Sequence, residues 1–472
     1  MRRKKFVNLL ALCICLSSLT LPACKQSGNG SRNDGIVLRV ASWDEYIDEG
    51  GEDSYVEDSS PLYEEFAQYY SEKTGVKVTV EYVPLQDNET MYNKMKMGDN
   101  YDLLCPSEYM MMKLKSEGKI QPFPASFFDK SNPENHYARN LSPFIESQFV
   151  DGGWYEYIAG YMWGSTGFVF NPEEIGNSVE ESRQIMSSWS ALTNKACHRE
   201  ITAKDNVRDS YFMGLGLYYE NELLGEKQAY LDKQQQFNQG IIDETQFKQA
   251  EEHYKNALKT KMNETSDETV AGVKEKLIQM RQNVYGLETD EGKLDVIAGR
   301  LNASYQWSGD AVFIIDEAES ESDLLLEYSI PSSASNLWFD GWVLSSEIAQ
   351  EKIAIATAFI NYLSQPINVV RNMYYIGYTS CISGNADDEE NLVYSYIEET
   401  YGYSEDCDDT PVEYDLSAYF GEGHILTVPE NQTRRQLFAQ YPDKETAKRL
   451  VVMQNFTKKD NEKLNRMWNT IK

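Results

Sequence analysis

The sequence of 472 residues is poor in positive charge, with 44 lysines and arginines against 75 aspartates and glutamates and a formal net charge of −31. This deficit argues against a nucleic-acid-binding protein, because neutralising phosphates requires clustered basic side chains. Hydrophobic residues are not lacking: they make up 41% of the chain, which is enough for a large buried core. The length predicts two or more lobes.

The common motifs of catalytic and nucleotide sites are also missing. The sequence contains no G-x-x-x-x-G-K-[ST], G-x-G-x-x-G, H-E-x-x-H or G-x-S-x-G segment. Carboxylates are so numerous that no pair stands out as a general acid and base. The four histidines lie far apart in unrelated contexts, and we interpret each as structural: His136, His198, His253 and His424. We therefore predict that the protein is not an enzyme and uses neither a cofactor nor a metal ion.

Cysteine is scarce in the main part of the chain. The first three of seven fall within the N-terminal 24 residues, and the other four are widely spaced without any C-x-x-C: Cys105, Cys197, Cys381 and Cys407. This spacing argues against a zinc site. One or two disulfides remain possible outside the cell, and buried free thiols are the slightly preferred interpretation.

The N-terminus has the pattern of a secretion signal. A basic stub at residues 2–5 precedes an apolar run at 6–19 that is too short to span a bilayer comfortably. The run ends in Leu21-Pro22-Ala23-Cys24, which resembles the lipobox of bacterial lipoproteins and implies cleavage after residue 23 and a lipid on Cys24. Residues 24–35 are polar and suit a flexible tether. The alternative is a buried helix. No later apolar run reaches 18 residues, so we expect a protein anchored at the outer face of the cell membrane, or on the periplasmic side in a bacterium with two membranes.

Strand and helix patterns alternate after residue 35. A β-branched run at 36–42 precedes a helical pattern that starts near residue 61 and stops at Gly75, and further strands are predicted at 76–82 and 103–105 with helices at 88–97 and 109–117. This order predicts an open α/β sheet with ligands beyond the carboxyl ends of its strands. Residues 221–286 are predicted to be a helical elaboration, with Thr265 and Glu268 as its capping box. Strands are expected again at 303–307, 311–315 and 342–344.

Aromatic residues accompany carboxylates or hydroxyls where predicted strands end. Four such segments lie at 42–46, 106–109, 306–310 and 337–340, and a fifth at 205–209 opens a predicted helix. Each tryptophan taken singly favours core packing. Together the segments predict an aromatic slot with acidic ends, which suits an alkyl chain carrying ammonium groups. Sugars would also stack on tryptophan, but they need neutral donors and acceptors more than full charges.

The segments resemble those of the spermidine/putrescine-binding proteins of bacterial polyamine ABC transporters. Eight stretches occur in the family's order and cover most of the mature chain outside 221–286: ASWDEYI (41–47), NETMYNKMK (88–96), YDLLCPSEY (101–109), YMWGSTGFVFN (161–171), DNVRDS (205–210), YQWSGDA (305–311), LWFDGW (337–342) and YYIGYTS (374–380).

The resemblance implies a ligand site made of eleven residues: Trp43, Asp44, Tyr46, Ser107, Tyr109, Asn206, Asp209, Trp307, Trp338, Asp340 and Tyr378. In the family, the counterpart of Asp340 holds an inner amine and that of Asp209 a terminal amine. Asn206 and Asp44 depart from the acid and the threonine that some members have there, which leaves the preferred polyamine open. As alternatives, Asp340 could pair with a buried arginine, and Asp209 and Arg208 could form only local salt bridges at the start of a helix.

The resemblance also implies a two-lobed periplasmic-binding-protein-like α/β fold with hinge strands and an inter-lobe ligand cleft. We expect an N-terminal lobe at 36–160 and 343–385, a C-terminal lobe at 161–342 and 386–472, and crossings near 158–163 and 338–343. The expected partners are a polyamine and the permease subunits of an ABC importer, with the protein a monomer. The alternatives are a solute-binding protein for a sugar or another organic cation, and an extracellular glycosidase that uses two carboxylates.

Overall fold

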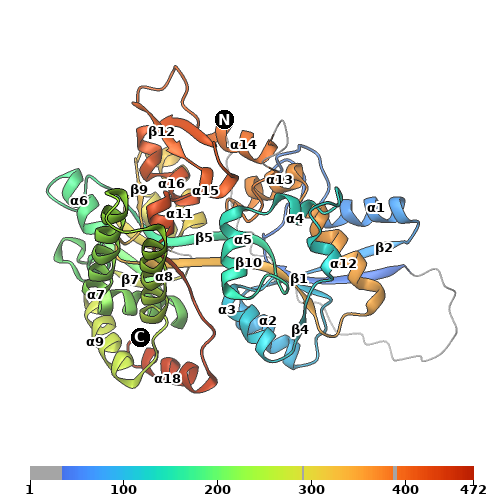
Figure 1. Cartoon of the computed structure of the whole chain (residues 1–472), viewed down its shortest axis with the longest axis horizontal. Helices are drawn as coiled ribbons and strands as arrows, with labels where there is room; N and C mark the ends of the chain where they lie inside the picture. Colours follow the sequence, from blue (N-terminus) through green and yellow to red (C-terminus); the bar gives the residue numbers. More distant parts are fainter. Residues whose placement is uncertain (1–34, 290–291, 386–390) are drawn as a thin grey trace, which may run out of the picture. The chain divides into compact units, whose positions relative to one another are not determined.

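The computed structural model describes residues 35–289, 292–385 and 391–472. The predicted signal peptide, the lipidated Cys24 and all but the last residue of the tether lie outside the described residues. Within 36–472, helices surround a mixed twelve-stranded sheet with the strand order β2-β1-β3-β10-β5-β8-β6-β7, and β12 and β13 form a separate hairpin (Figure 1). The fold class is α/β, as predicted.

The strands occupy these residues: β1 (Ile36–Trp43), β2 (Val78–Leu85), β3 (Leu103–Leu104), β4 (Ile120–Gln121), β5 (Ala159–Phe170), β6 (Ile201–Lys204), β7 (Gly286–Glu288), β8 (Ala303–Trp307), β9 (Glu327–Ser329), β10 (Ser335–Ser345), β11 (Thr379–Ser380), β12 (Pro411–Asp415), β13 (Ile425–Pro429) and β14 (Leu450–Val452). The α-helices are α1 (Leu62–Thr74), α2 (Asn88–Lys96), α3 (Glu108–Ser116), α4 (His136–Asn140), α5 (Pro143–Gly152), α6 (Val179–Met186), α7 (Val207–Asn238), α8 (Glu244–Lys261), α9 (Asp267–Asn283), α10 (Gly292–Ile297), α11 (Ser308–Ser322), α12 (Gln350–Leu363), α13 (Pro366–Ile376), α14 (Leu392–Tyr401), α15 (Ser417–Phe420), α16 (Gln436–Gln440), α17 (Lys444–Ala447) and α18 (Lys458–Trp468).

Two long antiparallel strands, β5 and β10, form the middle of the sheet. Every residue of both strands is buried, as expected for strands covered on both faces. One end of β10 pairs with β3 and β4, whereas the far end of β5 pairs with β8 and β9. Figure 1 shows the pair running between the part of the fold that holds β1 and β2 and the part that holds β7. These strands contain the segments predicted to cross between lobes.

Buried side chains form two clusters. The larger one fills the space around β1, β3 and β10, and the smaller one packs α7, α8 and α9 against β6 and β8. The larger cluster also includes Ile314 and Tyr419 from the predicted C-terminal lobe, so buried side chains run continuously past the crossing strands. The residue boundaries of the two lobes therefore stay a prediction.

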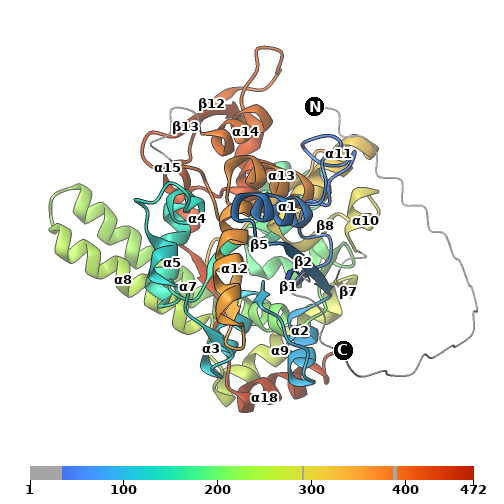
Figure 2. The same ribbon diagram turned by 90° about the vertical axis from the view of Figure 1, so that its right-hand side faces the viewer.

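Residues 221–286 are almost entirely helical, as predicted, and belong to α7, α8 and α9 (Figure 2). The predicted stripe of Val270, Val273, Leu277 and Met280 is buried on α9. The capping prediction was wrong in detail: Ser266, rather than Thr265, caps α9 by accepting from the amide of Thr269.

The strand predicted at 311–315 was also wrong, because these residues lie inside α11. A short apolar run that is buried on most sides gives no periodicity that separates strand from helix. Only Phe313 of the run is exposed. No single helix in the described ranges has the length and apolar character needed to span a membrane; α12 and α13 reach them only as a pair, bent by 73°.

Candidate functional site

Asp340 lies at an irregular point in the middle of β10. The register between β10 and β5 shifts between Asp340 and Gly341, and an isolated bridge joins Asp340 to Ser107 on the opposite side of the strand. Such bulges redirect side chains and occur next to functional sites. The irregularity places the carboxylate of Asp340 beside the ends of β1 and β3, where the sequence predicted ligand-binding residues.

One oxygen of the Asp340 carboxylate is bonded and the other is not. Oδ2 accepts hydrogen bonds from Trp43 Nε1 at 3.0 Å and from the Tyr46 hydroxyl at 2.8 Å. Oδ1 is buried and has no hydrogen-bond partner in the described part of the chain. An orphaned buried oxygen is costly, so this atom is suited to a partner supplied from outside the chain.

The pKa of Asp340 is raised because burial disfavours the charged carboxylate, although hydrogen bonds from its neighbours partly oppose the shift. No ion pair joins it to an arginine or lysine among the described residues, so the alternative of a structural pairing with a buried arginine is wrong for this part of the chain. Within the described residues Asp340 therefore has no positively charged partner, and a cationic ligand could supply one.

Aromatic rings surround this carboxylate. The ring of Tyr378 lies 5.3 Å from that of Trp338 and 6.0 Å from that of Tyr46, measured between centroids. Trp338 precedes Asp340 by two residues on the same strand, so both side chains lie on one face. Its indole approaches β5 closely, because a Cβ at Gly164 would lie only 2.6 Å from Trp338 Cζ2. The structure thus brings together six of the predicted residues: Trp43, Tyr46, Ser107, Trp338, Asp340 and Tyr378.

Glu108 is a second buried carboxyl group beside Asp340, and the sequence analysis missed it. It is the first residue of α3, and its Oε2 accepts from the amide of Phe339 at 3.4 Å. Burial, together with the charge of Asp340, raises the pKa of Glu108 to about 8. Glu108 is therefore mainly protonated at neutral pH, and Asp340 is the member of the pair that loses its proton first, because its charge raises the pKa of Glu108.

Trp307 lies in a second group of residues next to the one around Asp340. The charged members of this group were not among the predicted site residues. Lys204 Nζ lies 3.9 Å from the centroid of the Trp307 ring and 3.9 Å from Asp310 Oδ2. Lys293 also pairs with Asp310, at 2.8 Å. The Tyr378 hydroxyl donates to Asp310 Oδ1 at 3.1 Å and so connects this group to the one around Asp340.

The start of α7 holds Asn206 and Asp209 in mutual contact. Asn206 caps the helix by accepting from the amide of Asp209 at 2.8 Å, and its Nδ2 donates to Asp209 Oδ2 at 2.6 Å. Burial raises the pKa of Asp209, against the effects of Asn206, Lys204 and Arg208. These contacts are local, but they are hydrogen bonds to Asn206; no ion pair joins Asp209 to Arg208 within the described residues, so the local salt bridge of the alternative interpretation is not formed.

Tyr109 and Asp44 do not join the group around Asp340. The guanidinium of Arg208 lies 4.6 Å from the ring centroid of Tyr109 and 4.3 Å from that of Phe456. Asp44 is exposed next to Trp43, and no hydrogen bond or ion pair within the described chain connects its side chain to Asp340.

The sequence could have indicated the positions of Lys204 and Asp310 but not their contacts. Asp310 ends one of the aromatic segments, so its type and position were visible. Lys204 ends a short apolar strand just before the 205–209 segment, which is unusual for a lysine. Its partners at 289, 306 and 310 are distant in sequence, and no local pattern indicates them.

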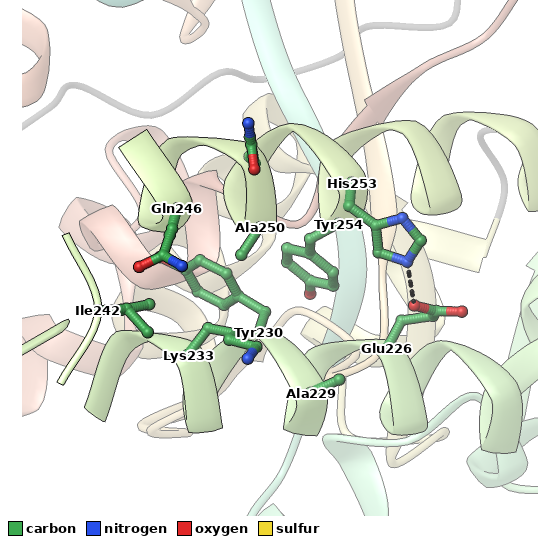
Figure 3. Close-up of a pocket in the computed structure, with 10 residues that line it drawn as sticks. Glu226, Ala229, Tyr230, Lys233, Ile242, Gln246, Ala250, His253 and Tyr254 are labelled. Carbon is green, nitrogen blue, oxygen red and sulfur yellow. Dashed lines mark ion pairs between the residues drawn. The ribbon is translucent and has the colours of Figure 1, made fainter. Parts of the chain in front are cut away.

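A separate groove of about 380 Å³ lies between α7 and α8 (Figure 3). Figure 3 shows the rings of Tyr230 and Tyr254 beside it and the ion pair of 3.3 Å between His253 and Glu226 at one end. None of the predicted site residues lines this groove. No cluster of three or more potential ligands for a metal ion occurs among the described residues.

Residues 65–394 match the family described as bacterial extracellular solute-binding protein, and the chain belongs to this family. The curated relatives confirm the predicted resemblance. Spermidine/putrescine-binding periplasmic proteins from Salmonella typhimurium and Escherichia coli are each 24% identical, over 71% and 73% of this chain and 74% and 78% of their own lengths. A putrescine-binding periplasmic protein from Pseudomonas aeruginosa is 23% identical over 74% of this chain and 79% of its own length.

Solved structures confirm the two-lobed, periplasmic-binding-protein-like fold. The spermidine/putrescine ABC transporter substrate-binding protein from Streptococcus pneumoniae matches with a TM-score of 0.57 and 22% identity over 92% of this chain and 98% of its own. A lipoprotein from Treponema pallidum matches with a TM-score of 0.58 and 16% identity over 92% of this chain and 99% of its own.

Proposed function

We propose that the protein is the solute-binding component of an ABC importer and that it captures a polyamine at Asp340. The observation that carries this proposal is the buried, unpartnered Oδ1 of Asp340 inside a group of aromatic side chains. The names of the curated relatives and of the pneumococcal protein support the same ligand class and the same transport role.

The chemistry around Asp340 suits an alkylammonium ion. An ammonium group would donate to Oδ1 and supply the cation that the carboxylate lacks, while the rings of Trp43, Trp338 and Tyr378 would cover the methylene groups. Contact of the cation with an aromatic face adds about 0.5–2 kcal/mol as water is excluded. A sugar would leave the charge of Asp340 without a cation, which argues against the sugar-binding alternative.

Transport would use the whole chain. The lobes at 36–160 with 343–385 and at 161–342 with 386–472 would close over the ligand, with bending near β5 and β10. Closure would bring a surface made of both lobes to the permease. The protein would act as a monomer and without enzymatic activity. The lipid on Cys24 would hold it at the outer face of the membrane.

Replacement of Asp340 tests the ligand assignment. We expect Asp340→Asn to weaken polyamine binding by about 2–5 kcal/mol, because it removes the charge that pairs with the ammonium group. Isothermal calorimetry with putrescine, spermidine and a maltodextrin measures this loss and the ligand class together. Asp232→Asn is the matched control, since it removes the same charge from an exposed position on α7 outside the predicted site and should leave the affinity within about threefold.

Two results would contradict the proposal. Binding of the maltodextrin with no heat from either amine would replace the polyamine by a sugar, and hydrolysis of a glycoside would indicate an enzyme. Equal affinity of Asp340→Asn and the unchanged protein would show that the ligand binds elsewhere.

The anchor requires a separate test. We expect Cys24→Ser to prevent lipid attachment, because only a thiol at this position can be diacylated, and to release the protein into the medium or periplasm. Metabolic labelling with a radioactive fatty acid, followed by cell fractionation, measures both effects. Incorporation of label into the Cys24→Ser variant would refute the lipobox interpretation.

A further inference from the structure

We propose that Lys204 acts as a built-in cation at the Trp307 side of the site, so that the protein selects a diamine such as putrescine over a triamine such as spermidine. This inference rests on the proposed function and adds a selectivity to it. The observations that support it are the position of Lys204, the pairing of the nearby carboxylates and a second cation on Tyr109.

Lys204 is held firmly in place. Its side chain is 1% exposed and extends from the last residue of β6. The ammonium group donates to the carbonyl of Thr289 at 2.9 Å and to Gln306 Oε1. Burial lowers the pKa of Lys204, and the negative charges of Asp310 and Glu288 oppose this shift. A lysine fixed in this way remains over the Trp307 ring and does not swing aside for a ligand.

The carboxylates near Lys204 already have partners. Asp310 pairs with Lys293 at 2.8 Å and with Lys204 at 3.9 Å, and it also accepts from Tyr378. Asp209 accepts from Asn206, and the charges of Lys204 and Arg208 act on it. Of the three buried aspartates at the site, Asp209, Asp310 and Asp340, only Asp340 faces no lysine or arginine of the described chain. The site therefore offers one unpaired negative charge.

Tyr109, like Trp307, has a cation of the protein on its aromatic ring. The guanidinium of Arg208 is stacked between Tyr109 and Phe456, and its Nη2 donates to the carbonyl of Gln454 at 2.6 Å. Trp307 and Tyr109, both predicted to contact the ligand, thus each have a protein cation on the ring. These two rings are less available to an ammonium group than Trp338 and Tyr378.

A further ammonium group near Trp307 would meet a like charge without a free carboxylate to balance it. Repulsion of this kind discriminates between ligands because it acts only on the one that carries the extra charge. A diamine places one ammonium group at Asp340 and has a single other charge to accommodate, whereas a triamine has two. Selectivity would follow from the number of charges as well as from length.

Calorimetric titration of the full chain with putrescine and spermidine tests the inference. We expect the unchanged protein to bind putrescine at least tenfold more tightly. Lys204→Gln retains a donor for the carbonyl of Thr289 but removes the charge, and it should reduce this ratio to about threefold or less by improving spermidine binding. Lys248→Gln is the matched control, because Lys248 is exposed on α8, and it should leave the ratio unchanged.

The possible results separate the inference from the proposed function. Tighter binding of spermidine by the unchanged protein overturns the inference without requiring any variant to fold. An unchanged ratio in Lys204→Gln, with both amines still bound, also overturns it and leaves the polyamine assignment intact. Failure of both amines to bind the unchanged protein overturns the proposed function, and the inference with it.

Discussion

At the residue scale, the site contains two neighbouring carboxyl groups that differ in how easily they lose a proton. Asp340 and Glu108 are both buried and cannot both be ionised without strong repulsion. Asp340 accepts two hydrogen bonds from side chains that favour its charged form, whereas Glu108 has the pKa of about 8. A protonated Glu108 thus allows a single negative charge to face the ligand at neutral pH.

The raised pKa of Glu108 predicts that the stability of the protein depends on pH. An unfolded Glu108 loses its proton near its ordinary pKa of about 4.5, whereas the folded protein keeps it until about pH 8. The folded state binds more protons between these values, so the free energy of unfolding should decrease as pH rises from 5 to 8. Glu108→Gln cannot titrate and should decrease less over this range. Urea denaturation at pH 5, 6.5 and 8 compares the two slopes.

The same substitution has a second expected outcome. Glutamine resembles the protonated acid, so Glu108→Gln should bind putrescine within about threefold of the unchanged protein at pH 7. A large loss of affinity at this pH would mean that an ionised Glu108 contacts the ligand. Parallel slopes in the denaturation series would mean that Glu108 titrates normally.

At the scale of elements, the packing of α11 against Tyr378 fixes one wall of the site. Gly309 is the second residue of α11, and a Cβ there would lie 1.8 Å from Tyr378 Cδ1. This atom is close to the base of a bulky ring and cannot move away easily. Tyr378 in turn contacts the rings of Trp338 and Tyr46.

We therefore expect Gly309→Ala to displace Tyr378, to lower the free energy of unfolding by about 1–3 kcal/mol and to weaken ligand binding. Gly225→Ala in α7 is the matched control, because no atom lies within 4 Å of its added Cβ. This control should stabilise the protein by about 0.5–1 kcal/mol, since alanine favours helix more than glycine does. Denaturant unfolding and calorimetry measure both effects; equal behaviour of the two variants would contradict the assignment of Tyr378.

The helices α9 and α11 show which secondary structure a local sequence pattern can predict and which it cannot. The spacing of Val270, Val273, Leu277 and Met280 predicted a helix, because one face is apolar and the other polar. Residues 311–315 include no polar residue that would mark the opposite face of a helix, so their helix could not be predicted. In the same way, Trp43 and Asp340 could be predicted from segments in order along the chain. The contacts of Lys204 depend on a fold that brings β6 beside β8, which no local pattern specifies.

At the scale of the whole molecule, the two clusters of buried side chains contain three of the four later cysteines. Cys105 and Cys381 belong to the larger cluster and Cys197 to the smaller one, whereas Cys407 is partly exposed. All four are free thiols, in agreement with the slightly preferred prediction. The two hydrophobic clusters therefore form without a covalent link between these cysteines.

This arrangement predicts the reactivity of each thiol. Burial raises the pKa of Cys105 and Cys381 well above its usual range and that of Cys197 to about 12, and only the thiolate reacts. We expect an alkylating reagent to modify Cys407 in the native protein and the other three only after denaturation, with peptide mass mapping as the measurement. A reductant should leave the melting temperature unchanged, because these residues form no disulfide that it could cleave. A disulfide-linked peptide that joins Cys105 to Cys381, or a melting temperature lowered by the reductant, would show that the mature protein oxidises within its larger core.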